Sequence, residues 1–244
     1  MTDTIAILKK HSSVRDFLAK PVADELLREI LLAGQQAATS NHIQAYSILR
    51  MRDQEKRQKL AALCGQQKHV AVSPVFLVFC ADLKRLQQAC ELHSETIFPG
   101  AAEAFILATV DTALAAQNVM AAAESAGLGG VYIGGIRNHP REVCELLAIP
   151  KYVYPVFGMC LGYPAKVNDV KPRLPLEAIL KEDAYTPDDP ALMATYDQQV
   201  AEYYAKRTAG ERTTSWTDGV AAMMKTKQRP HMKAFLAEQG FDFD

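Results

Sequence analysis

Residues 101–126 read AAEAFILATVDTALAAQNVMAAAESA, a stretch made mostly of alanine and larger apolar residues. It is long enough to be compared with a membrane span. Alanine is only weakly apolar, however, and the stretch is interrupted by Glu103, Asp111, Gln117, Asn118 and Glu124. We interpret it as a long helix that is apolar on nearly every side and is therefore buried, either within one domain or between two subunits.

Strand and helix patterns alternate on both sides of this helix. Six consecutive apolar residues at 75–80 predict a strand that is covered on both faces. Further strands are expected at 46–51, 131–133 and 153–161, and helices at 3–10, 24–34, 53–64, 82–93 and 140–149. The order lacks a strict βαβαβ cadence.

The pattern of residue types changes after residue 175. Asp188-Asp189-Pro190 predicts the start of a helix, because proline is favoured in the first turn. The polar stretch 206–214 has a single alanine as its only apolar residue and is expected to be a mobile loop. We expect one domain over residues 1–244, in which approximately 176–244 forms a C-terminal arm.

Composition and charge exclude several classes of protein. The hydrophobic content of 49% and the charged content of 23% are ordinary for a soluble globular protein. A formal net charge of −1 gives no field that would attract nucleic acid or an anionic membrane. The five cysteines show no CxxC spacing, and the N-terminus lacks the pattern of a signal peptide. Buried free thiols and a cytoplasmic location are expected.

Metal and hydrolase motifs are missing from the sequence. The six histidines are dispersed without HxxxH or HExxH spacing, so we expect no metal site. A GxSxG motif is also missing, and no pattern supports a nucleophilic cysteine.

Two basic segments far apart in the chain could bind a phosphate. They are His11-Ser12-Ser13-Val14-Arg15 and Lys171-Pro172-Arg173. Taken alone, each segment is better described as solvated surface. Taken together, they offer the several fixed cations and donors that a phosphate dianion requires.

A glycine-rich segment could lie against a flat ligand. Gly129-Gly130-Val131-Tyr132-Ile133-Gly134-Gly135 holds four glycines in seven residues, and glycine permits close backbone approach. The segment does not match GxGxxG, so a Rossmann dinucleotide fold is not indicated. A simple turn–strand–turn remains an alternative.

These segments, together with Gln67, resemble a known family over nearly the whole chain. Further matches are the stretches GMCLGYP at 158–164, KPRLP at 171–175 and the tyrosine-rich segment 196–204. The chain resembles the FMN-dependent nitroreductases, in the branch of the oxygen-insensitive NADPH nitroreductases and flavin reductase P. The resemblance implies an α+β fold with a nitroreductase-like central mixed β-sheet wrapped by helices. It also implies an intertwined homodimer with two FMN sites at the interface.

The resemblance also assigns site residues. Those implied to bind FMN are His11, Ser12, Ser13, Arg15, Thr39, Ser40, Gln67, Tyr132, Ile133, Gly134, Gly135, Lys171 and Arg173. Arg207 and Arg212 fall where the family has a mobile loop that binds the 2′-phosphate of NADPH. One departure concerns Ser12, which stands where the family usually has an arginine, so one cation is missing near the site.

The implied activity is FMN-dependent NAD(P)H oxidation in a ping-pong mechanism. NADPH delivers hydride to flavin N5 and leaves, and a nitroaromatic, quinone or flavin acceptor then takes the electrons. FMN carries the chemistry, so no catalytic side chain is expected. Two alternatives stay open: a dedicated flavin reductase that supplies reduced FMN to a partner, and a non-catalytic flavin-binding redox sensor.

Overall fold

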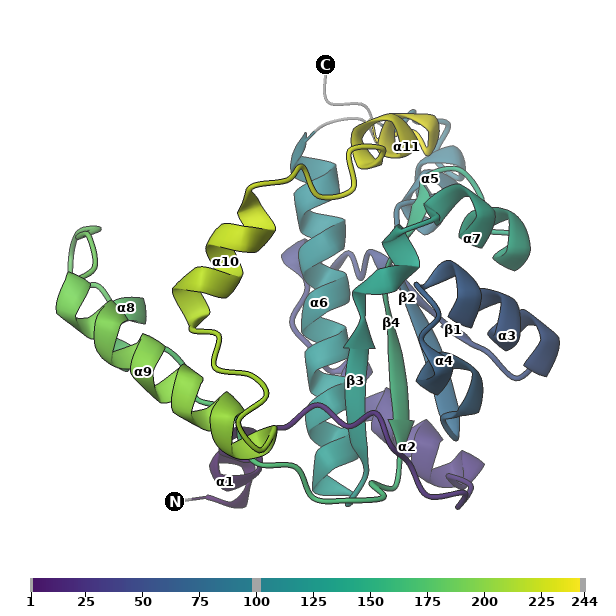
Figure 1. Ribbon diagram of the computed structural model, residues 1–244. Helices are drawn as coiled ribbons and strands as arrows, with labels where there is room; N and C mark the ends of the chain where they lie inside the picture. Colours follow the sequence, from purple (N-terminus) through teal and green to yellow (C-terminus); the bar gives the residue numbers. More distant parts are fainter. Residues whose placement is uncertain (1, 98–101, 242–244) are drawn as a thin grey trace. The chain divides into compact units, whose positions relative to one another are not determined.

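The computed structural model describes residues 2–97 and 102–241 (Figure 1). Its elements in chain order are α1 (Asp3–Lys9), α2 (Asp24–Gln35), η1 (Ser40–His42), β1 (Tyr46–Arg50), α3 (Gln54–Leu63), α4 (Lys68–Val72), β2 (Val75–Asp82), α5 (Lys84–Glu91), α6 (Ala102–Ser125), β3 (Gly129–Ile133), η2 (Gly134–Arg137), α7 (Pro140–Leu147), β4 (Val153–Gly162), α8 (Leu176–Ile179), α9 (Pro190–Arg207), α10 (Trp216–Met224) and α11 (Met232–Glu238).

The chain divides into two compact units. The larger unit comprises the described parts of residues 1–168 and 231–244 and holds the sheet. The smaller unit comprises residues 169–230 and holds α8, α9 and α10. In the smaller unit, Asp197 of α9 accepts a hydrogen bond of 2.9 Å from the Thr217 backbone N–H, and Tyr196 packs edge-on against Trp216. The expected single domain with an arm from about residue 176 stays a prediction.

The sheet has four strands in the order β1-β2-β4-β3. All three pairings between these strands are antiparallel, and the β2–β4 register shifts by one residue between Phe79 and Cys80. The expected central sheet wrapped by helices is confirmed. A mixed sheet also needs a parallel strand, and the pairings described within this chain contain none.

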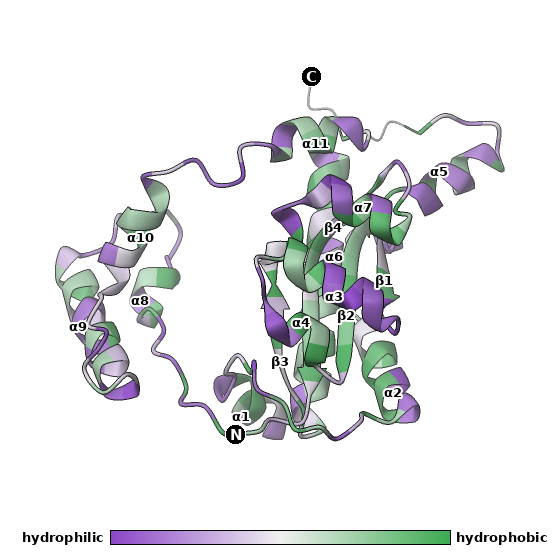
Figure 2. Cartoon of the chain, turned by 45° about the vertical axis from the view of Figure 1, so that its right-hand side comes forward, coloured by the Kyte–Doolittle hydropathy of each residue, from purple (hydrophilic) through white to green (hydrophobic). Residues whose placement is uncertain are grey.

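Strand β2 is buried along its whole length, as its apolar run predicts. Alternate residues from Val75 to Phe79 face α2 and α6, whereas Phe76, Val78 and Cys80 face α3, α4 and α7. The sheet therefore separates two apolar layers within the larger unit (Figure 1). In Figure 2, hydrophobic colouring dominates β2, whereas the outer helices α3 and α5 carry mostly hydrophilic colouring.

Helix α6 meets the length and composition criteria of a membrane span. Its residues Ala116, Val119 and Met120 are nevertheless fully buried against the sheet and α2, and Asp111 within it is also buried. The expected long core helix is therefore confirmed for the described residues 102–125, whereas its burial on nearly every side stays a prediction. Its outer face remains half exposed at Ile106, Val110 and Leu114.

Helix caps follow the sequence signals where these are strong. Asp53 accepts a hydrogen bond from the Lys56 N–H at the start of α3, and Asp189 accepts one from Ala191 at the start of α9. The short helices α4 and α8 were not expected, because five and four residues are too few to show an apolar period.

Candidate functional site

The N-terminal basic segment lies as an extended chain beside the sheet. The Val14 N–H donates to the Gly130 carbonyl at 2.8 Å, and Phe17 forms an isolated bridge with Pro164. Val14 is buried, whereas Ser13 and Arg15 on either side of it are exposed. This alternation turns the two polar side chains away from the core.

His11 and Ser12 lie near the C-terminal end of α6. The Nδ1 atom of His11 is 2.6 Å from the carboxylate of Glu124. Ser12 lines a small cavity of about 210 Å³ together with Glu124 and Gly129. The Ser13 carbonyl accepts a hydrogen bond of 3.1 Å from Asn168.

Gln67 has its amide fixed by two neighbours. Its Nε2 donates to the Cys64 carbonyl at 2.8 Å, so its Oε1 must be the atom that faces His69 Nε2 at 3.1 Å. An amide oxygen only accepts, so His69 carries a proton on Nε2. One N–H of Gln67 remains for a ligand.

Gly135 lies against the Gln67 amide, and the charge of Arg15 acts on the neighbouring His69. Burial and the positive charge of Arg15 lower the pKa of His69, and Asp16 opposes them only in part. A Cβ on Gly135 would lie 2.8 Å from Gln67 Nε2, which leaves no room for a side chain. We call Arg15, Gln67, His69 and Gly135 the amide cluster. His69 was missed because nothing in its spacing distinguishes it from a solvated residue.

The segment 132–135 offers its backbone rather than its side chains. Ile133 is 1% exposed and belongs to the core. The Tyr132 ring packs edge-on against Phe157 at 5.1 Å, and burial raises the pKa of its hydroxyl. Gly134 has space around it, because a Cβ there would make only ordinary contact with Arg137. A flat ligand could therefore approach the backbone at Gly134 and Gly135.

Thr39 and Ser40 precede a turn that is anchored to α6. The Ser40 and Ala45 N–H groups donate to the two carboxylate oxygens of Asp111 at 3.0 and 3.1 Å. Between them the backbone has positive φ at Asn41, His42 and Gln44. The turn is thus attached to the helix on one face of the sheet, whereas the amide cluster borders α3 and α4 on the other face.

The predicted cations of the smaller unit gather around one ring. Lys171 Nζ lies 5.1 Å and Arg212 Cζ 3.8 Å from the centroid of the Tyr204 ring. Arg207 donates to the Tyr203 hydroxyl at 3.2 Å, and Arg173 donates to the Lys171 carbonyl at 3.1 Å. The structure therefore joins residues that the resemblance assigns to two different ligands.

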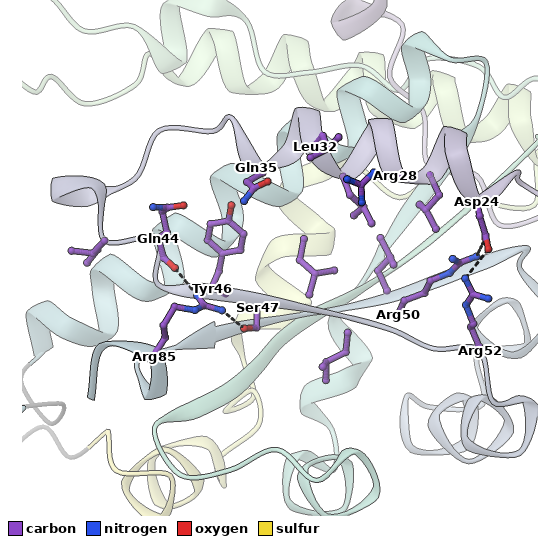
Figure 3. Close-up of a pocket in the computed structure, with 16 residues that line it drawn as sticks. Asp24, Arg28, Leu32, Gln35, Gln44, Tyr46, Ser47, Arg50, Arg52 and Arg85 are labelled. Carbon is purple, nitrogen blue, oxygen red and sulfur yellow. Dashed lines mark hydrogen bonds and ion pairs between the residues drawn. The ribbon is translucent and has the colours of Figure 1, made fainter. Parts of the chain in front are cut away.

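A larger groove of about 910 Å³ lies between α2 and β1 (Figure 3). Three of the four arginines that line it have partners, since Arg50 and Arg52 bind Asp24 and Arg85 binds the Gln44 and Tyr46 carbonyls. None of the residues predicted to bind FMN or NADPH lines it.

The described part of the chain gives little support to a metal site or a reactive cysteine. Across residues 2–97 and 102–241, no group of three or more His, Cys, Asp or Glu side chains could hold a metal ion. All five cysteines are free thiols, and four of them are buried. Burial raises the pKa of Cys64, Cys144 and Cys160 to about 12, which keeps these thiols protonated and unreactive.

Two family models together match most of the chain. The nitroreductase family matches residues 8–163, and the C-terminal domain of the nitroreductase family matches residues 171–244. The first match contains the amide cluster, and the second contains the cations around Tyr204.

Several named proteins of similar length are similar to this chain over nearly its whole length. The chain is 44% identical over 241 residues to the oxygen-insensitive NADPH nitroreductase of Salmonella typhimurium, covering 99% of each protein. It is 41% identical over 247 residues to the FMN reductase (NADPH) of Bacillus subtilis, again covering 99% of each. The solved NADPH:FMN oxidoreductase of Vibrio harveyi, in complex with NAD⁺, has a TM-score of 0.91 at 37% identity and 98% coverage of both chains. The chain belongs to the nitroreductase family.

Proposed function

We propose that this chain is an FMN-dependent NADPH oxidoreductase that reduces nitroaromatic, quinone or flavin acceptors in a ping-pong mechanism. The observation that carries the proposal is the amide cluster. It combines an amide with one N–H left for a ligand, the bare backbone of Gly135 beside that amide, and a guanidinium whose charge acts on His69. A guanidinium binds phosphate, an amide N–H binds the polar edge of a ring, and a bare backbone lets a flat ring approach closely.

The residues present fit FMN in both charge and shape. Arg15 would hold the phosphate, assisted by His11, Ser12 and Ser13. The free N–H of Gln67 would bind the polar edge of the ring, and the ring would lie against the backbone of 132–135. Bound FMN would supply the redox chemistry, accepting hydride at N5 and passing the electrons on. The protein would bind and orient both substrates in turn, and no side chain would need to act as a general base.

We propose further that the active form is an intertwined homodimer. Ile106, Val110 and Leu114 recur every four residues on the outer face of α6 and are 51%, 49% and 43% exposed. A partner surface would cover this apolar stripe. Thr39 and Ser40 are attached to the opposite face of the sheet from the amide cluster, so one flavin would take these hydroxyls from the second copy.

We propose in addition that Lys171 and Arg173 bind FMN and that Arg207 with Arg212 selects NADPH over NADH. Small-molecule acceptors, rather than nucleic acid or membranes, fit the near-neutral charge of the chain. The free cysteines suit a reducing compartment, so we place the protein in the cytoplasm.

The proposal is tested by purifying the protein and reducing it without oxygen. We expect a yellow protein that is bleached by NADPH and recoloured by nitroaromatic, quinone and flavin acceptors added separately. Arg15→Ala and Gln67→Ala should weaken FMN binding, measured by flavin fluorescence. Arg52→Ala is the matched control, because Arg52 is exposed and makes only a surface ion pair with Asp24. A colourless protein that takes up no added FMN would refute the proposal.

A further inference from the structure

The cations around Tyr204 have no described acidic partner. Among the ion pairs of the described residues, none involves Lys171, Arg207 or Arg212. Two of these three charges nevertheless lie against a single ring, and Arg207 contacts the adjacent tyrosine. Like charges held together without a counterion are a feature of sites that receive an anion.

The local backbone explains how Arg212 reaches the ring. Helix α9 ends at Arg207, and the chain then reverses through left-handed residues at Ala209 and Gly210. The Gly210 N–H donates to the Ala205 carbonyl at 2.8 Å, which closes the helix end. The Arg212 N–H then donates to Thr208 Oγ1 at 2.9 Å. The stretch expected to be a mobile loop is thus tied to the helix at two points.

The two neighbouring tyrosines hold the cations in different ways. Tyr203 uses its hydroxyl, which accepts from Arg207 one turn later in the helix. Tyr204 offers its ring face to Arg212, and the two tyrosine rings pack edge-on at 5.3 Å. Burial alone would raise the pKa of the Tyr204 hydroxyl, but the hydrogen bond from Lys171, together with the charges of Lys171 and the two arginines, outweighs it and lowers the pKa.

We propose that Tyr204 is a positioning residue that makes the protein selective for a nucleotide carrying a phosphomonoester, the adenosine 2′-phosphate of NADPH. Its ring holds the Arg212 guanidinium beside Arg207 and Lys171. The phosphate therefore binds to cations that are held in position before it arrives. The inference rests on the proposed function for the identity of the nucleotide. The role of Tyr204 in binding a phosphate dianion can be measured without turnover.

The test measures binding of adenosine 2′,5′-bisphosphate and of adenosine 5′-monophosphate to the purified full-length protein by calorimetry. Tyr204→Leu removes the cation–π contact and should weaken the bisphosphate roughly 3- to 30-fold, the range for an exposed to a desolvated contact. The monophosphate should change by less than about 2-fold. Tyr204→Phe keeps the ring that holds Arg212 and loses only the hydroxyl that interacts with Lys171, so it should bind the bisphosphate more tightly than Tyr204→Leu does. Tyr185→Leu is the matched control, because Tyr185 is 85% exposed in the same unit.

Thr208→Val gives a second, independent variant. It leaves the ring in place but removes the hydroxyl that binds the Arg212 N–H. Selective loss of bisphosphate binding in this variant would support the proposal even if Tyr204→Leu failed to fold. Equal loss for both nucleotides, or no loss in either folded variant, would overturn it.

Steady-state kinetics separate this inference from the proposed function. In Tyr204→Leu, KM for NADPH should rise by the same factor as the bisphosphate affinity falls. KM for NADH should stay unchanged. If the wild type oxidises NADPH and Tyr204→Leu has an unchanged KM, the positioning role fails and the function stands. If the wild type oxidises neither nucleotide but binds the bisphosphate through Tyr204, the function fails and the anion site stands.

Discussion

Gly135 lies so close to Cys64 that a Cβ on the glycine would overlap the Cys64 carbonyl oxygen and lie 3.0 Å from the carbonyl carbon. The same carbonyl accepts the hydrogen bond that orients Gln67. The lack of a side chain at Gly135 and the orientation of the Gln67 amide therefore both depend on the position of the Cys64 carbonyl group.

The first prediction concerns this close contact. Gly135→Ala should destabilise the protein by about 1–3 kcal/mol, because the Cys64 backbone, directly after α3, would have to move. Gly134→Ala should change stability by less than about 1 kcal/mol, since its Cβ would meet only Arg137 at 3.6 Å. Urea unfolding of the flavin-free proteins compares the two. Equal losses in both variants would show that the contact is not what excludes a side chain at 135.

The second prediction concerns the buried carboxylate of Asp111. Asp111→Ala leaves the Ser40 and Ala45 N–H groups without their acceptor and should cost about 2–5 kcal/mol. Thr112→Val is the control, because Thr112 is also buried and, among the described residues, its hydroxyl bonds only to the Ala108 carbonyl within α6. Its cost should stay near 1 kcal/mol.

Unfolding by urea measures both costs, and amide hydrogen exchange at Ser40 and Ala45 locates the effect. Exchange should accelerate at these two positions in Asp111→Ala and stay slow in Thr112→Val. Unchanged protection in Asp111→Ala would contradict the anchoring role.

The third prediction concerns the pH dependence of stability. The folded state lowers the pKa of His69, so the unfolded chain binds this proton more tightly. Stability is therefore lost as the pH falls through the unfolded-state value of about 6.5. His69→Gln should lose less stability than the wild type between about pH 7.5 and pH 5.5. Urea unfolding of the flavin-free proteins at both pH values gives the comparison.

His93→Gln serves as the control for this pH series, because His93 is exposed. It should keep the pH dependence of the wild type. A wild type and a His69→Gln variant with parallel pH profiles would refute the lowered pKa of His69.

The sequence predicted elements whose patterns are long or strongly capped. The six-residue apolar run of β2, the length of α6 and the Asp53 and Asp189 caps each have a local physical signature. Helix α4 has none, because five residues cover little more than one turn. Local sequence patterns therefore predicted most helices and strands of the larger unit but not the short helix α4.

The sequence names candidate site residues one by one, and these assignments stay predictions, whereas the geometry of the candidate site could not be predicted. The glycine run and Gln67 were identified, whereas the bond from His69 to Gln67 depends on how a short helix follows a left-handed residue at Gln66. The grouping of Lys171 with Arg212 depends on a chain reversal about forty residues further along the sequence. Contacts of this kind arise from tertiary structure, which no local pattern encodes.

The fourth prediction concerns the packing of α2 on α6. A Cβ on Gly34 would overlap Val119 Cγ2, and both residues are buried. Gly34→Ala improves helix propensity by about 1 kcal/mol, but the overlap should outweigh this gain and leave a net loss of about 1–2 kcal/mol. Val119→Ala removes the obstructing methyl groups and should by itself cost about 1–3 kcal/mol.

The double variant Gly34→Ala/Val119→Ala decides whether the two residues are complementary. The new methyl group on residue 34 enters the space that Val119 vacates, so the double variant should be more stable than the two single losses predict. The coupling energy should reach about 1 kcal/mol or more, measured by urea unfolding of all four proteins. Strict additivity would mean that the helices shift apart to accommodate the added methyl group, and that Gly34 is not required for their close approach.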